Sequence, residues 1–149
     1  MSFDTKKIYQ ILSEKKYARN WSGFHPRANH RGLVVGTAIL VDANGVSIPG
    51  MTLQIELRVG TVVADCLIFY SIFQLIGSRR VRGYQLEVCP DEKLSHNGVQ
   101  KIFGPHEHMP NGETHAVQEN GVNCNNWDAS FKYFLKRTNI EFFPVEQPC

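Results

Sequence analysis

The chain has 149 residues, 42% of them hydrophobic and 11% aromatic, which is enough apolar material for one packed core and excludes intrinsic disorder. We therefore expect a single globular domain over residues 1–149. The net charge of +2 is too small to predict nucleic-acid binding from charge alone.

The cysteines and the apolar segments bear on location. No two cysteines form a C-x-x-C pair, so their spacing is typical neither of a zinc ribbon nor of a dense disulfide framework: Cys66, Cys89, Cys124 and Cys149. Unpaired cysteines favour a reducing compartment. Residues 1–7 lack the apolar core of a signal peptide, and the longest apolar stretch, residues 66–73, is too short to span a bilayer. We expect a cytoplasmic protein with no membrane contact.

The first predicted element is an amphipathic helix over residues 3–18. Asp4 is its expected N-cap, and Phe3 with Ile8 has the spacing of a hydrophobic staple. Ile11 and Leu12 extend the apolar stripe that Ile8 begins. The lysines of this segment are expected to be solvated, with a basic binding face as the alternative: Lys6, Lys7, Lys15 and Lys16.

Strands dominate the middle of the chain. After a polar connector over residues 20–31, residues 33–41 form a largely apolar strand, and residues 51–58 alternate as a half-buried antiparallel strand does. Residues 66–76 and 84–88 are expected to form a hairpin with a basic tip at residues 77–83. A second amphipathic helix begins after the cap Asn126 and ends at Asn139, and residues 140–143 form a last short strand.

This order of elements predicts the α+β class. We expect a mainly antiparallel sheet of about five to six strands, with an N-terminal and a C-terminal amphipathic helix packed on it.

The stretch over residues 104–115 is the segment best suited to carry chemistry. Its Asn111-Gly112 pair is a strong signal for a β-hairpin, because both central residues of a type I′ turn need positive φ. With this pair at the turn centre, His108 lies opposite His115. Since side chains alternate along a strand, one face then carries four functional groups: His106, His108, Glu113 and His115.

This arrangement depends on the strand register. Pro110 cannot donate the hydrogen bond that a two-residue turn requires, whereas a four-residue loop over residues 110–113 keeps the same pairing. A three-residue loop would shift the pairing by one residue and break up the cluster.

Three imidazoles and a carboxylate suit two kinds of chemistry. His106, His108 and His115 could serve as general acids and bases at a scissile phosphate without a metal. Together with Glu113 they could instead ligate zinc, iron or another borderline divalent metal. The third interpretation is that they are loop histidines with no such role. The sequence alone leaves the cofactor unknown.

Two other segments carry candidate substrate-binding residues. Cationic side chains there could hold an anionic substrate, although a charged hairpin tip is more often simply solvated: Arg79, Arg80, Arg82, His30 and Arg31. The sequence contains no P-loop, dinucleotide fingerprint, nucleophile elbow or zincin motif.

The second half of the chain resembles a class of small prokaryotic and phage-associated proteins. The resemblance is carried by residues 84–88, by the Pro-His-x-His segment of residues 104–108, and by the terminal amphipathic helix. That class includes toxins of toxin–antitoxin pairs and families of unknown function. The resemblance implies a compact RNA-cutting or translation-blocking protein, with His106 and His108 as the functional positions.

The sequence supports three hypotheses about function. The first is a metal-independent ribonuclease that uses the histidines as acid and base and the arginines to stabilise charge. The second is a non-catalytic binding or inhibitor protein that docks on another macromolecule. The third is a His/Glu metal-binding protein. RNA or a protein is accordingly the expected partner, and the oligomeric state is left open.

Overall fold

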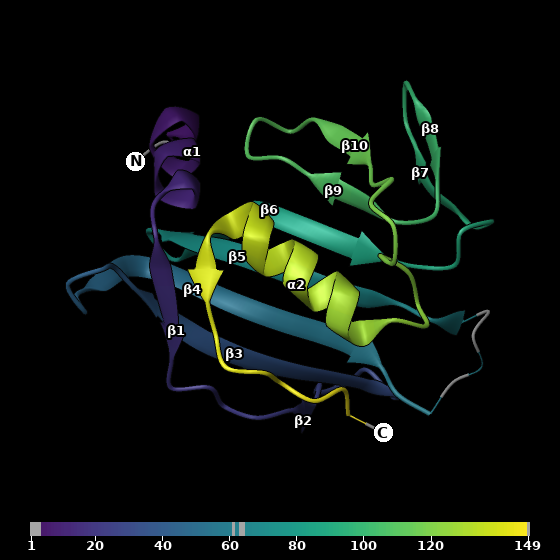
Figure 1. Ribbon diagram of the computed structural model, residues 1–149, viewed down its shortest axis with the longest axis horizontal. Helices are drawn as coiled ribbons and strands as arrows, with labels where there is room; N and C mark the ends of the chain where they lie inside the picture. The colour runs from purple at the N-terminus through teal and green to yellow at the C-terminus, as the bar shows by residue number, and fades with distance from the viewer. Residues whose placement is uncertain (1–3, 61, 63–64, 149) are drawn as a thin grey trace.

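The computed structural model describes residues 4–60, 62 and 65–148. Two helices, α1 (Thr5–Ser13) and α2 (Trp127–Thr138), accompany a long sheet, and α2 runs across one of its faces (Figure 1). The strands are β1 (Lys16–Arg19), β2 (His25–Pro26), β3 (Leu33–Val41), β4 (Ser47–Arg58), β5 (Ile68–Ile76), β6 (Arg79–Val88), β7 (Leu94–Asn97), β8 (Lys101–Phe103), β9 (His106–His108), β10 (Thr114–Ala116) and β11 (Ile140–Glu141). Neither described helix has the length and apolar character needed to cross a membrane.

The main sheet has nine strands in the order β10-β9-β6-β5-β4-β3-β1-β11, with β2 paired to β3. Its pairs are antiparallel except β1 with β11, and β7 with β8 forms a separate two-stranded sheet. The α+β class and the mainly antiparallel sheet are confirmed, but five to six strands was too few. The strands of this sheet that the sequence did not predict are β1 and β2, which have four and two residues and are too short for alternation to reveal them.

The core lies between the sheet and α2. On β4 the buried positions alternate as predicted: Met51, Leu53, Ile55 and Leu57. From α2, Trp127, Phe131 and Phe134 pack against the ring of Tyr70 on β5 at centroid distances of 5.5–6.0 Å. Both predicted caps of α2 are confirmed, since Asn126 accepts a hydrogen bond from the Ala129 amide and Asn139 adopts the left-handed conformation.

The N-terminal segment differs from its prediction. Asp4 caps α1 as expected, but the helix ends at Ser13, and Lys16 begins β1 with its side chain fully buried. The Lys16 ammonium donates to the carbonyl oxygens of Ile11 (2.6 Å), Leu12 (3.2 Å) and Glu14 (2.6 Å). It thereby satisfies carbonyls that the helix end leaves free, while its burial lowers the pKa to about 8. The expectation that Lys16 is solvated was wrong, and the staple residue Phe3 lies outside the described residues.

The basic hairpin tip was also predicted wrongly. Gly77, with φ of +63°, allows a turn of two residues. The strand β6 therefore begins at Arg79, which pairs with Ile76, and Arg80 and Arg82 lie within the ladder and not in a loop.

A disulfide joins Cys66, before β5, to Cys124, before α2, with a Cα–Cα distance of 6.2 Å. The two residues are 58 positions apart, so only the folded chain brings them together. The expectation of unpaired cysteines was wrong for this pair. Cys89 is free and buried, as a structural cysteine is, and Cys149 lies outside the described residues.

Candidate metal centre

The β9–β10 hairpin has the three-residue loop that separates the predicted cluster. The Met109 amide donates to the Glu113 carbonyl at 2.8 Å, and Gly112 takes the positive φ of +90°. His108 therefore pairs with Thr114, while His115 pairs with Glu107. Pro110 and Gly112 explain the choice. Proline suits the second position of the type I turn that the Gly112 N–H closes onto the Met109 carbonyl at 3.0 Å, and Gly112 supplies the left-handed residue that follows such a turn in a three-residue hairpin loop. The prediction that His115 lies opposite His108 was wrong.

His106 and His108 form a cluster with a residue that the sequence did not single out. Strand β9 pairs with β6, so that His106 lies opposite Glu87. The two Nε2 atoms are 3.1 Å apart, and Glu87 Oε1 lies 3.6 Å from that of His106 and 4.0 Å from that of His108. These side chains are on the sheet face away from α2. Glu87, His106 and His108 are referred to below as the triad.

Hydrogen bonds orient both imidazoles toward the centre of the triad. His106 Nδ1 lies 3.2 Å from the carbonyl oxygen of Gly104, which can only accept, so Nδ1 carries the proton and Nε2 presents its lone pair. Burial lowers the pKa of His106 and keeps it neutral. His108 Nδ1 lies 3.4 Å from Thr114 Oγ1. A partner on Nδ1 that directs Nε2 inward is the usual arrangement around metal-bound histidines.

Gly104 is required by the local packing. It has φ of +78°, and a Cβ there would stand 3.0 Å from the Asp91 Cα. Its carbonyl also accepts a hydrogen bond from Ser95 Oγ of β7 at 2.7 Å. The Gly104 carbonyl therefore contacts both the β7–β8 hairpin, through Ser95, and the ring of His106.

A third imidazole lies next to the triad. The ring centroid of His96, on β7, is 6.2 Å from that of His106 and 6.2 Å from that of His108. Sequence reasoning missed His96 and Glu87 because each reaches the site through a pairing between separate segments. The sequence has no local signal for Glu87, since it alternates with apolar residues in the run of residues 84–88 just as Gln85 does.

The remaining predicted residues lie at differing distances from the triad. His115 is exposed and pairs with Glu113 at 3.0 Å, so these two are not brought into it. Arg82 is the nearest predicted arginine, since it donates to Gln85 Oε1 at 3.1 Å and Gln85 pairs with His108. Three more predicted residues are not brought to the triad: Arg79, His30 and Arg31. Of these, His30 and Arg31 lie in the exposed β2–β3 connection, and β3 is three strands from β6, about 14 Å at normal strand spacing.

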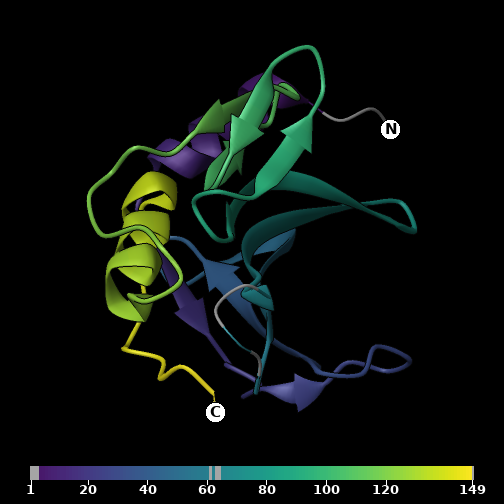
Figure 2. The same cartoon turned by 90° about the vertical axis from the view of Figure 1, so that its right-hand side faces the viewer.

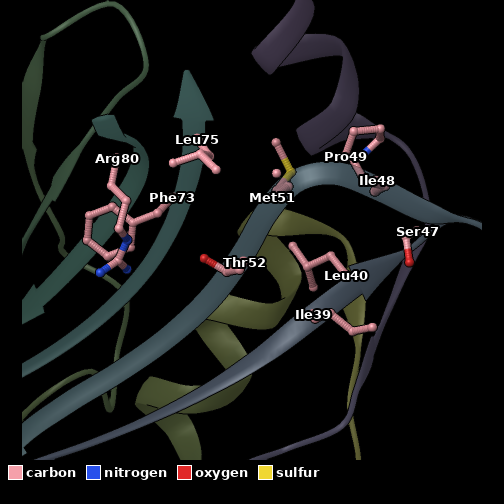
Figure 3. Close-up of a pocket in the computed structure, with 11 residues that line it drawn as sticks. Ile39, Leu40, Ser47, Ile48, Pro49, Met51, Thr52, Phe73, Leu75 and Arg80 are labelled. Atoms are coloured by element: carbon pink, nitrogen blue, oxygen red, sulfur yellow. The ribbon is translucent and has the colours of Figure 1, made fainter. Parts of the chain in front are cut away.

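Arg80 borders a different feature, an apolar pocket of about 320 Å³ at the β3–β4 bend (Figure 3). Its guanidinium lies 4.3 Å from the centroid of the Phe73 ring and donates to Gln54 Oε1 at 2.8 Å. The pocket forms where the β3–β4 register shifts beyond Ile39. Arg80 is thus occupied in the packing of this pocket.

The chain was compared with protein-family models, curated proteins and solved structures. None of them matches. The resemblance to toxin-type proteins therefore stays a prediction.

Proposed function

We propose that this protein binds one zinc-class divalent ion through Glu87, His106 and His108. The observation that carries the proposal is the convergence of these three side chains, whose ligand atoms lie 3.1–4.0 Å from one another. A neutral His106 Nε2 faces the Glu87 carboxylate at 3.6 Å, which places a lone pair against an anion. A cation between them would turn this unfavourable contact into a favourable one.

The spacing of the three atoms favours tetrahedral coordination. Donors at about 2.0–2.1 Å from a zinc ion lie about 3.3–3.4 Å apart in a tetrahedron. The triad shows 3.1, 3.6 and 4.0 Å. An octahedral ion such as Fe²⁺ would hold the same three donors at about 3.0 Å, and magnesium or calcium would prefer oxygen ligands. Zinc is therefore the best match, and Fe²⁺ is the next.

Hydrolysis of RNA is the reaction that we propose for this ion. A zinc ion with three protein ligands can take a water in the fourth position and lower its pKa to about 7. In this proposal Arg82, which donates to Gln85 Oε1 at 3.1 Å, would hold a phosphate of the substrate. The burial of His106, which is 1% exposed, weighs against its direct use as an acid or base in a metal-independent ribonuclease. Cleavage that a chelator abolishes would support the metal-dependent form.

We also propose two alternatives to hydrolysis and a cellular location, each of which was expected from the sequence. A non-catalytic binding or inhibitor protein, or a toxin-like protein that acts on RNA, would fit the same chain. A cytoplasmic location is also proposed, although its argument from unpaired cysteines no longer applies to Cys66 and Cys124.

Zinc affinity in matched histidine variants tests the metal site. We expect His106→Ala to weaken zinc binding by more than about 100-fold, because it removes a ligand and not merely an outer-shell partner. His115→Ala is the control, since His115 belongs to the adjacent strand but not to the triad, and its affinity should equal that of the wild type. Competition with a chromogenic chelator, on protein without a His-tag, measures both. Equal losses in the two variants, or no zinc binding by the wild type, would refute the proposed ligands.

A further inference from the structure

We infer that His96 is the fourth ligand of this centre and that metal binding fixes the β7–β8 hairpin against the sheet. This inference rests on the proposed metal site. It adds His96, which lies on β7 and not on the strands of the triad, and it assigns the β7–β8 hairpin a position that depends on the bound metal.

Ring distances place His96 just outside ligand range. Two imidazoles bound to one tetrahedral zinc ion have ring centroids about 5.2 Å apart, given zinc–nitrogen distances near 2.0–2.1 Å. The centroids of His106 and His108 are 4.8 Å apart, and that of His96 is 6.2 Å from each. A movement of about 1 Å toward the triad therefore brings His96 to coordination distance.

The β7–β8 hairpin is held near the triad by few hydrogen bonds, so His96 can move toward the triad without a change in the main sheet. The strands β7 and β8 form a two-stranded sheet of their own, and Figure 2 shows their hairpin projecting at the top of the molecule. Their attachment near the site is the backbone of Gly104, which bonds to the Lys93 carbonyl at 2.8 Å and to Ser95 Oγ at 2.7 Å. His96 is the next residue after this attachment, while the hairpin end at Val99 is fully exposed.

Space for the movement is present on the open side of the hairpin. A hollow of about 410 Å³ lies between β7–β8 and the β9–β10 loop, and His96, Thr114 and His115 line it. His96 Nε2 now lies over Gly98, 2.8 Å from where a Cβ would stand, so the ring has room because residue 98 has no side chain. Coordination through Nε2 therefore requires the ring to turn from Gly98 toward the triad.

The position of the β7–β8 hairpin would decide whether the ion has four protein ligands or an open coordination position. With His96 bound, four protein ligands close the coordination sphere, as in structural zinc sites. With the hairpin displaced, the fourth position becomes open to water, as in catalytic zinc sites. The hairpin is therefore the element that controls access to the ion.

Two readouts on the full chain test this inference, with zinc as the probe. We expect His96→Ala to weaken zinc binding by more than about 100-fold, as loss of a ligand should, whereas the control His25→Ala, an exposed histidine on β2, leaves it unchanged. We also expect zinc to slow tryptic cleavage after Lys101, on β8, in the wild type and in His25→Ala but not in His96→Ala.

The outcomes separate the two proposals. If the wild type binds zinc and His96→Ala binds it within about threefold of the same affinity, less than an outer-shell effect, the triad stands and the role of His96 is overturned. Zinc binding without protection of Lys101 overturns the closure of the hairpin in the same way. If the wild type binds no zinc, the proposed function fails, and the inference fails with it.

Discussion

Replacing Glu107 by alanine is expected to lower the free energy of unfolding by about 3 kcal/mol, because the change leaves buried partners without their acceptor. Glu107 is 5% exposed and lies on β9 between the two histidines of the triad. It accepts from Tyr84 Oη at 2.6 Å and from Arg137 Nε at 2.8 Å. Burial and this bond to Glu107 raise the pKa of Tyr84, so that its hydroxyl remains a donor.

Urea unfolding measures this effect, with Glu113→Ala as the matched control. Glu113 is exposed and pairs only with the exposed His115, so its loss should change the free energy by less than about 0.5 kcal/mol. Glu107→Gln should fall between the two, since an amide oxygen still accepts from Tyr84. A loss below about 1 kcal/mol in Glu107→Ala would show that this network contributes little.

Removing the Cys66–Cys124 disulfide is expected to cost about 2–4 kcal/mol, because the bond closes a long loop and restricts the unfolded chain. The bond spans 58 positions and ties the β4–β5 connection to the start of α2. Unfolding of the Cys66→Ala/Cys124→Ala variant, compared with the wild type under reducing and non-reducing conditions, measures it. The reduced wild type should match the variant.

Peptide mapping without reductant is the control for this second result. It should recover the peptides of Cys66 and Cys124 joined to each other, with Cys89 in neither. Equal stability of the wild type with and without reductant, or unlinked peptides, would mean that the pair is not bonded in the protein.

Elements with strong local patterns could be predicted from the sequence. The strand β3 has the predicted bounds, the alternation of β4 is confirmed by its buried face, and α2 begins and ends at its predicted caps. Each of these depends on neighbours within a few residues. Short strands such as β1 and β2 could not be predicted, because they exist only through pairing with β3 and the rest of the sheet.

In the candidate site, too, the residues set by local sequence were predicted and those set by contacts between distant segments were not. His106 and His108 were found because two residues of separation in one strand place both side chains on one face. Glu87 and His96 were not found, since they come from β6 and β7 and reach the site through strand pairing and hairpin docking. His115 was wrongly included because one residue of loop length decides the register, and the Asn-Gly signal outweighed the proline before it.

X-ray absorption at the zinc edge tests the central claim, that the triad is a metal centre, most directly. We predict that tag-free protein retains about one zinc ion per chain, with nitrogen and oxygen ligands at about 2.0–2.1 Å, imidazole scattering from at least two histidines, and no sulfur shell near 2.3 Å. Protein that retains no zinc after loading and desalting, or a spectrum with sulfur ligands, would contradict the account.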